Sequence, residues 1–138
     1  MADVKYVLTL DEEQARLVSH ACDFLSRIHI GQLRELRWEY MEMHIENGTQ
    51  SKYVEMCNEV DRKIDELNDL AYPSCRYGKY RAVHDSRTAD VLYNVHQVLR
   101  HKIAYQHNPE GGIGVDFHEP MRLGAAPVPE CKVVKNDV

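Results

Sequence analysis

The chain has 138 residues, of which 43% are hydrophobic and 28% charged, an ordinary composition that excludes wholesale disorder. Its net charge of −5 argues against general DNA binding, because affinity for the phosphate backbone grows with the number of cations delivered. The sequence has no apolar run of the ~20 residues that span a bilayer and no secretory pattern near Met1. The four cysteines are too few for a disulfide scaffold. We therefore expect one cytoplasmic domain over residues 1–138.

The first predicted elements are a short strand at residues 5–8 and a helix that begins at Thr9. Thr9 and Glu12 have the spacing of a capping box, in which each side chain accepts the other's backbone N–H. Apolar residues then recur at steps of three and four, which predicts one buried helical face made of Leu17, Val18, Ala21, Phe24, Leu25 and Ile28. Gly31 ends or kinks this helix.

Two further helices are expected before the middle of the chain. The first covers residues 32–46 and ends at Asn47-Gly48. The second is capped by Thr49 or Ser51 and ends before Pro73, which cannot donate a backbone hydrogen bond. Residues 72–86 then read as a long loop, and loops of this length are often functional.

A fourth helix is predicted over residues 87–106, capped by Asp85 or Ser86, followed by a break at residues 108–112. Residues 113–118 alternate apolar and polar, as in a half-buried strand, and residues 132–134 are a further strand candidate. Residues 125–138 form an extended tail. The predicted fold class is α+β and mainly helical: three to four helices with a small antiparallel sheet formed by the N-terminal and C-terminal strands.

Basic charge is concentrated in one stretch of this acidic chain. Residues 76–107 carry six basic and two acidic side chains, with four histidines interleaved. Within the loop, Arg76-Tyr77-Gly78-Lys79-Tyr80-Arg81 alternates basic and aromatic residues. Guanidinium groups fork onto phosphates, tyrosine rings stack on bases, and glycine admits a close ligand. This stretch indicates a site for a small phosphorylated ligand, although a solvated loop and helix end would give the same pattern.

An alternative interpretation rests on carboxylates. Glu39 and Glu42 lie three residues apart on one predicted helix, and Glu66 and Asp69 lie three apart on the next. If the helices pack antiparallel, four carboxylates could hold Mg²⁺, which resembles the all-α nucleoside triphosphate pyrophosphohydrolases. Acidic helix faces are also common without any metal. The histidine spacings do not favour a metal site, and no motif of nucleophilic catalysis or phosphate-cradling glycine loop is present.

Four segments of the chain resemble a known family. They are Leu8-Thr-Leu-Asp-Glu-Glu-Gln-Ala, Phe24-Leu-Ser-Arg-Ile-His-Ile-Gly-Gln, Tyr93-Asn-Val-His-Gln-Val-Leu-Arg-His-Lys-Ile-Ala-Tyr and Asn108-Pro-Glu-Gly-Gly-Ile-Gly-Val-Asp-Phe-His-Glu-Pro. Together they resemble the first-described family of phage Thoeris anti-defence proteins. The resemblance covers most of the chain, although residues 40–75 match little.

The resemblance implies a non-enzymatic phage protein that sequesters nucleotide immune signals in the host cytoplasm. The signals would be glyco-cyclic ADP-ribose isomers and also cyclic oligonucleotides, whose capture blocks Thoeris-type and CBASS-type effectors. No cofactor, metal or membrane is implied, and the partner is the signal together with further copies of the chain, as a dimer or hexamer. By this resemblance Arg27 and Arg100 are phosphate ligands, and the remaining ligand-binding candidates are Gln32, Arg76, Tyr77, Gly78, His101, Asn108, Gly111 and Gly112.

The ligand's linkage isomer and ring size, the number of sites, and whether the C-terminal strand pairs within or between chains are left open by the sequence. A third hypothesis, a module that inhibits a host enzyme by protein contact, is also open at this stage.

Overall fold

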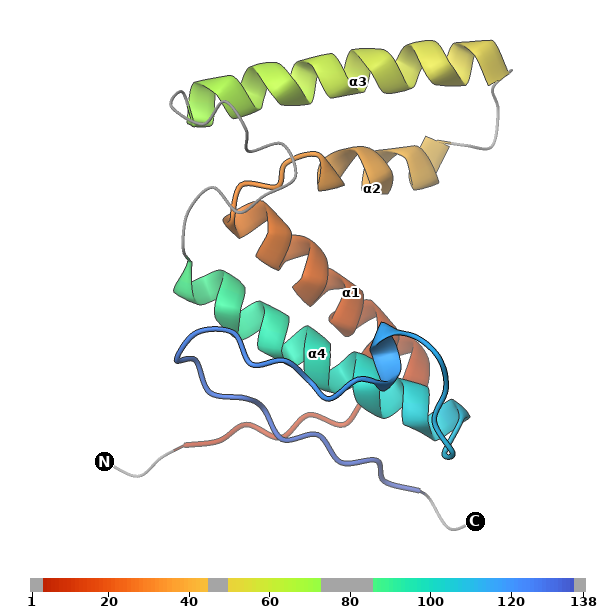
Figure 1. Ribbon diagram of the computed structural model, residues 1–138, viewed down its shortest axis with the longest axis vertical. Coiled ribbons are helices and arrows are strands. Elements are labelled where there is room, and N and C mark those ends of the chain that lie inside the picture. The colour runs from red at the N-terminus through yellow and green to blue at the C-terminus, as the bar shows by residue number, and fades with distance from the viewer. Residues whose placement is uncertain (1–3, 45–49, 73–85, 136–138) are drawn as a thin grey trace. The chain divides into compact units, whose positions relative to one another are not determined.

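The computed structural model describes residues 4–44, 50–72 and 86–135. Over these ranges the chain forms α1 (Glu12–His29), α2 (Glu35–His44), α3 (Gln50–Ala71), α4 (Arg87–His107) and a 3₁₀ helix, η3 (Val115–Phe117) (Figure 1). Contacts group the chain into two compact units, residues 1–23 with 91–138 and residues 24–90. We call them the first and second unit. In the described ranges no helix has both the length and the apolarity to cross a membrane.

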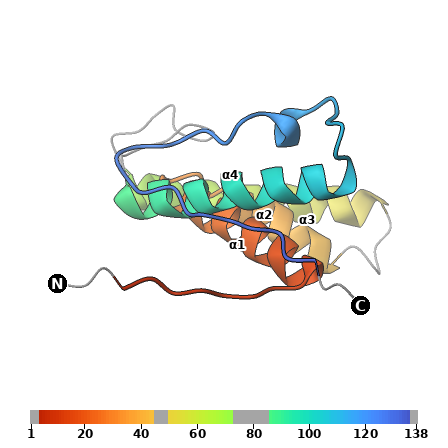
Figure 2. The same ribbon diagram turned by 90° about the horizontal axis from the view of Figure 1, so that it is seen from below.

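In the first unit α1 runs antiparallel to α4, and an irregular strap, residues 115–126, lies along α4 (Figure 2). The fully buried Asn94 holds the strap: its Oδ1 accepts from the Leu123 N–H at 2.8 Å, and its Nδ2 donates to the carbonyls of Leu123 and Ala126. Gln97 Oε1 accepts from the Met121 N–H at 3.2 Å. Amides on a helix therefore satisfy the backbone of the strap, as a neighbouring strand would in a sheet.

In the second unit α2 and α3 pack side by side as an antiparallel pair (Figure 1). Arg34 forks onto the Asp65 carboxylate at 2.9 and 3.0 Å, and Arg37 reaches Asp61 at 3.0 Å. Ile64, which lies between Asp61 and Asp65 in the sequence, is buried. Partly buried guanidinium–carboxylate pairs of this kind fix the register of the two helices.

The predicted antiparallel sheet is wrong, because the described residues contain no strand. Residues 5–8 and 132–134 are extended without a backbone partner, and residues 115–117 form η3 instead of a strand. Gly114, at φ +132°, breaks the alternation of residues 113–118 immediately before η3. Beyond η3 the strap bonds to the amides of α4, so it is not available to pair with residues 5–8.

The four helices agree with the predicted ones, with shifted ends. α1 ends as predicted at a Gly31 C-cap (φ +88°): Gly31 N–H donates to the Ile28 carbonyl and Gln32 N–H to the Arg27 carbonyl. Because of this cap, α2 begins at Glu35 and not at the predicted residue 32. α4 is capped by Ser86, whose Oγ accepts from the Ala89 N–H at 3.2 Å.

The predicted capping box at Thr9 and Glu12 is wrong, because the reciprocal pair is Asp11 and Gln14. Gln14 N–H donates to Asp11 Oδ1 at 2.8 Å, and Asp11 N–H donates to Gln14 Oε1 at 3.0 Å. Aspartate followed three residues later by glutamine makes the same reciprocal pair of hydrogen bonds, two residues further along the chain.

The predicted buried face of α1 is also wrong in part. Leu17 and Leu25 are 62% and 43% exposed, whereas Ser19 and Ser26 are buried. In the first unit this follows from the partner helix: α4 presents His96 to α1, and a histidine ring is bonded by serine rather than by leucine.

Candidate functional site

A cleft of about 440 Å³ lies within the first unit, where α1, the C-terminal half of α4 and η3 meet. Two guanidinium groups and three imidazoles contribute to its wall, beside two aspartates and one aromatic ring. The lining residues are Arg16, Ser19, His20, Asp23, His96, Arg100, Ile103, Ala104, His107, Asn108, Asp116 and Phe117.

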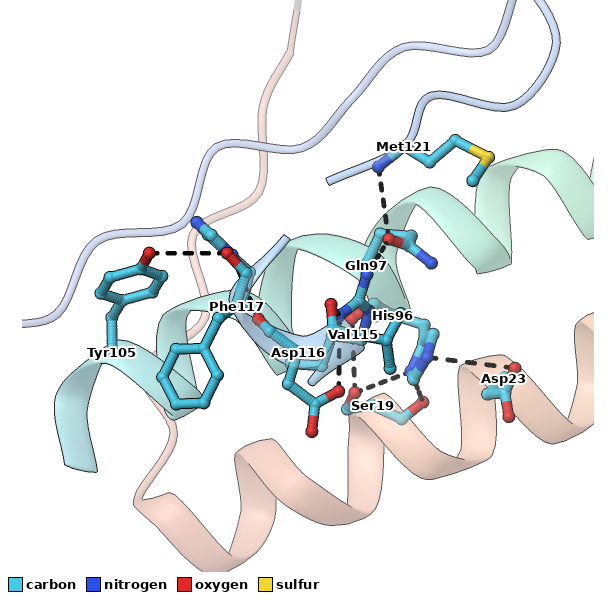
Figure 3. Close-up of polar contacts among 11 residues, drawn as sticks. Ser19, Asp23, His96, Gln97, Tyr105, Val115, Asp116, Phe117 and Met121 are labelled. Carbon is cyan, nitrogen blue, oxygen red and sulfur yellow. Dashed lines mark hydrogen bonds and ion pairs between the residues drawn. The ribbon is translucent and has the colours of Figure 1, made fainter. Parts of the chain in front are cut away.

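The α1 wall of the cleft is joined to α4 through His96 (Figure 3). His96 Nδ1 lies 3.1 Å from the Ser19 carbonyl oxygen, which can only accept, so this nitrogen carries the proton and donates. The Ser19 hydroxyl lies 3.0 Å from the same nitrogen, and His96 Nε2 lies 4.0 Å from Asp23 Oδ1. These contacts join Ser19 and Asp23 of α1 to His96 of α4 along one wall of the cleft.

Arg100 lies on the opposite wall, and its side chain is only 10% exposed. It donates to the Val115 carbonyl, to Gln97 Oε1 and to Asp116 Oδ1, the last at 3.4 Å. These three acceptors fix the guanidinium plane at the edge of the cleft. The guanidinium also holds η3 against α4, so it has both a structural and a potential binding role.

The Glu12 carboxylate accepts hydrogen bonds from two side chains that line the cleft. Glu12 Oε1 accepts from His107 Nε2 at 2.7 Å and from Arg16 Nε at 2.9 Å. The hydrogen bond from His107, followed by that from Arg16, holds the pKa of Glu12 below its ordinary value. Glu12 therefore stays ionised and keeps both side chains directed along the cleft wall.

The turn after α4 carries Phe117 into the cleft. Gly111 N–H donates to the Asn108 carbonyl at 2.9 Å, and Asn108 Nδ2 donates back to the Gly111 carbonyl. Gly111 has φ +84°, and a Cβ on Gly112 would stand 2.6 Å from the Phe117 ring. The two glycines are thus required by the backbone and by the close approach of an aromatic ring.

The predicted site residues fall into three groups. The structure brings Arg100 and Asn108 into the cleft, and His101, Gly111 and Gly112 support its wall, since His101 Nδ1 donates to the Asp116 carbonyl at 3.2 Å. Arg27 and Gln32 belong to the second unit, where Arg27 lies 3.6 Å from Glu35. Arg76, Tyr77 and Gly78 lie outside the described residues.

The sequence analysis did not identify four of the basic side chains that line the cleft: Arg16, His20, His96 and His107. Two signals could have found them. Arg16 and His20 are four residues apart on α1, and on α4 the positions 96, 100 and 107 recur at helical spacing.

The carboxylates of the alternative hypothesis are not gathered by the described structure. Glu66 pairs with Arg62, and the α3 aspartates that face α2 are Asp61 and Asp65, each bonded to an arginine. The side chain of Glu42 lies outside the described residues. In the part of the chain that is described, no group of three or more histidine, cysteine or acidic side chains could hold a metal ion.

Comparison with known proteins gives no relative: no family model, no curated protein and no solved structure matches the chain significantly.

Proposed function

We propose that the chain binds a small nucleotide signal in the cleft of the first unit and sequesters it without cleavage. The signal is a cyclic ADP-ribose isomer or a related cyclic nucleotide, captured by a phage protein to block a host defence effector. The observation that carries this proposal is the set of N–H donors in one small cleft: Arg16, Arg100 and three imidazoles line it, beside Asp23 and Asp116.

The size and lining of the cleft support a ligand of this class. A volume of about 440 Å³ falls within the range of small-molecule sites. Guanidinium and imidazole N–H groups are donors to the oxygens of a pyrophosphate, and the Phe117 ring offers a face for a base. The resemblance of the segments around Arg100 and Asn108 to the anti-defence family supports the same ligand class.

Carboxylates hold the donors of the cleft in place, although Asp116 also competes with an anionic ligand for Arg100. Glu12 holds Arg16 and His107, and Asp116 holds Arg100 while itself 60% exposed. These carboxylates position the donors before a ligand arrives, which reduces the entropy that binding would cost. A ligand phosphate replaces the carboxylate of Asp116 at Arg100, one anion for another.

Isothermal titration tests this proposal, with cyclic ADP-ribose isomers and cyclic oligonucleotides as ligands and linear ADP-ribose as a comparison. Arg100→Lys keeps the charge but loses the fork, so we expect affinity to fall about 10-fold or more, ~1.4 kcal/mol per tenfold. Lys102→Ala, an exposed change on the same helix, is the matched control and should leave affinity within about twofold.

Asp116→Asn provides a test in the opposite direction. Removing the competing charge should strengthen ligand binding by about two- to fivefold, the size of one exposed ion pair. If wild type binds no member of the panel, or if Arg100→Lys binds as tightly as wild type, the cleft is not the site. Circular dichroism of each variant verifies that its helices are retained.

A further inference from the structure

His96 of α4 lies between two oxygens of α1, one at each of its ring nitrogens (Figure 3). Nδ1 lies 3.1 Å from the Ser19 carbonyl oxygen, and Nε2 lies 4.0 Å from Asp23 Oδ1. The side chains of His96 and Asp23 are only 19% and 23% exposed, so water and salt screen this pair less than an exposed one. Ser19 and Asp23 are four residues apart on α1 and therefore share one face of that helix.

The two protonation states of the His96 ring fit these surroundings differently. A carbonyl oxygen and a carboxylate only accept hydrogen bonds, so both nitrogens face groups that call for an N–H. The neutral ring has one N–H. With that proton on Nδ1, where the Ser19 carbonyl accepts it, the lone pair of Nε2 faces the Asp23 carboxylate. The imidazolium has two N–H groups and a positive charge, and so matches both partners.

We propose that His96 is a pH-sensitive positioning residue of the cleft. As the imidazolium it bridges Ser19 and Asp23 and holds α1 against α4; as the neutral ring it keeps Ser19 and releases Asp23. We call the first arrangement the His96 bridge. An ordinary histidine changes its charge near pH 6.5, so the bridge responds to pH in the physiological range.

Other titratable and charged groups line the same cleft on all three of its elements. They are Arg16 and His20 on α1, Arg100 and His107 on α4, and Asp116 on η3. Arg100 is bonded to Asp116, and His107 is bonded to Glu12. The Tyr93 ring, 5.7 Å from the His96 ring, adds no charge. Asp23 is thus the carboxylate that pairs with His96, and the test must separate this pair from the other histidines.

The bridge also affects the ligand of the cleft, and this step rests on the proposed function. Asp23 lines the cleft, where its negative charge opposes an anionic ligand. The imidazolium of His96 offsets that charge, whereas the neutral ring does not. Affinity for a cyclic ADP-ribose isomer should therefore be higher at pH 6 than at pH 8, and Asp23→Asn should reduce that ratio by about two- to fivefold.

Urea denaturation of the full chain tests the bridge through a double-mutant cycle of His96→Gln and Asp23→Asn at pH 5.5 and pH 9. Both variants keep a polar side chain but cannot form the ion pair. At pH 5.5 the two changes should be coupled by about fivefold in the unfolding equilibrium constant, and at pH 9 by less than about twofold. His118→Gln, an exposed change on the strap, is the matched control and should not couple to Asp23→Asn at either pH. Equal coupling at both pH values, or none at pH 5.5, would overturn the proposal.

Nitrogen-15 NMR of wild type tests the bridge without any variant that must fold. Both ring nitrogens of His96 should carry protons at pH 5.5, and only Nδ1 at pH 9. A neutral ring at pH 5.5, or a ring that keeps its proton on Nε2 at pH 9, would contradict the assigned states.

Isothermal titration at pH 6 and pH 8 separates the bridge from the proposed function. A ligand that binds with the same pH ratio in wild type and in Asp23→Asn would overturn the effect of the bridge on the cleft and leave sequestration standing. If no ligand binds at either pH, the proposed function is wrong, and the urea cycle alone decides whether the bridge exists.

Discussion

Asn94 takes the place of a strand partner in the first unit. It is fully buried, and its amide is bonded to the backbone of Leu123 and Ala126. A buried amide is favourable only while its bonds are made, because an unsatisfied polar group loses its hydration without compensation. The side chain therefore fixes the strap at one register along α4.

Removal of the Asn94 amide should be strongly destabilising. Asn94→Ala leaves the Leu123 N–H and two carbonyls without partners, and we expect the free energy of unfolding to fall by about 2–4 kcal/mol. Urea denaturation measures the loss. Lys102→Ala is the control, with an expected change within about 0.5 kcal/mol; equal losses in the two variants would remove Asn94 from its assigned role.

Gly112 makes room for the aromatic ring that lines the cleft. In Gly112→Ala the new Cβ would stand 2.6 Å from Phe117, so the ring or the turn must move. We expect a destabilisation of about 1–3 kcal/mol in urea denaturation, as for other overpacked sites. Phe117→Leu should relieve the clash, so a double-mutant cycle should show favourable coupling between the two changes. Additive effects would contradict the contact.

Glu12 predicts a dependence on pH. His107 and Arg16 lower its pKa in the folded chain below the ordinary value of 4.5. A lowered carboxyl pKa contributes stability above the ordinary value, and this contribution is lost as the pH falls through the lowered pKa. In His107→Gln the pKa of Glu12 should rise toward 4.5, which a carboxyl NMR titration measures. An unchanged titration would show that His107 does not hold this carboxylate.

At the scale of elements, the helices could be predicted because their signals are local. Apolar periodicity, the Gly31 cap and the Ser86 cap are all set by neighbours within a few residues. The burial of α1 could not be predicted, since it depends on which residues of α4 face it. Ser19 is buried by His96, a residue 77 positions away, while Leu17 of the apolar stripe is 62% exposed.

The prediction of strands was wrong for a related reason. Residues 5–8 and 113–118 have the composition and alternation of strands, but a strand also requires an edge to pair with. In this chain the amides of Asn94 and Gln97 bond to the backbone of the strap, and in the described ranges residues 5–8 and 132–134 make no backbone–backbone hydrogen bond. Composition and alternation thus show which segments resemble strands, but they do not show whether a neighbouring strand is present.

The start of α1 gives a direct comparison between the predicted and observed caps. Asp11→Ala removes the acceptor of the Gln14 N–H and should reduce the free energy of unfolding by about 1 kcal/mol. Thr9→Ala, at the predicted but incorrect cap, should have almost no effect. Thermal or urea denaturation of the two variants distinguishes the caps, and a larger loss in Thr9→Ala would contradict the observed one.

At the scale of the whole molecule, the two units carry different parts of the predicted site. Arg100 and Asn108 meet in the cleft of the first unit, and Arg27 lies in the second unit with Glu35. The sequence motifs could locate the arginine on α4 because its neighbours Gln97 and His101 form a recognisable segment. Helical spacing indicates that Arg16 and His20 share a face of α1, and that positions 96, 100 and 107 share a face of α4. The sequence does not show that these two faces meet, which follows from the antiparallel packing of α1 on α4.

The single-domain organisation over residues 1–138 stays a prediction. The first unit contains all the lining residues of the cleft, so ligand binding is assigned to it.

The most direct test of the proposed function is the recovery of ligand from the complex. A cyclic ADP-ribose isomer is mixed with the full chain, free ligand is removed by ultrafiltration, the protein is denatured by heat, and the released molecule is chromatographed. The account predicts that the ligand is retained in stoichiometric amount, released with unchanged retention time, and retained far less by Arg100→Lys. A ligand that passes the filter unbound, or one that is released as a cleaved product, would contradict sequestration by this cleft.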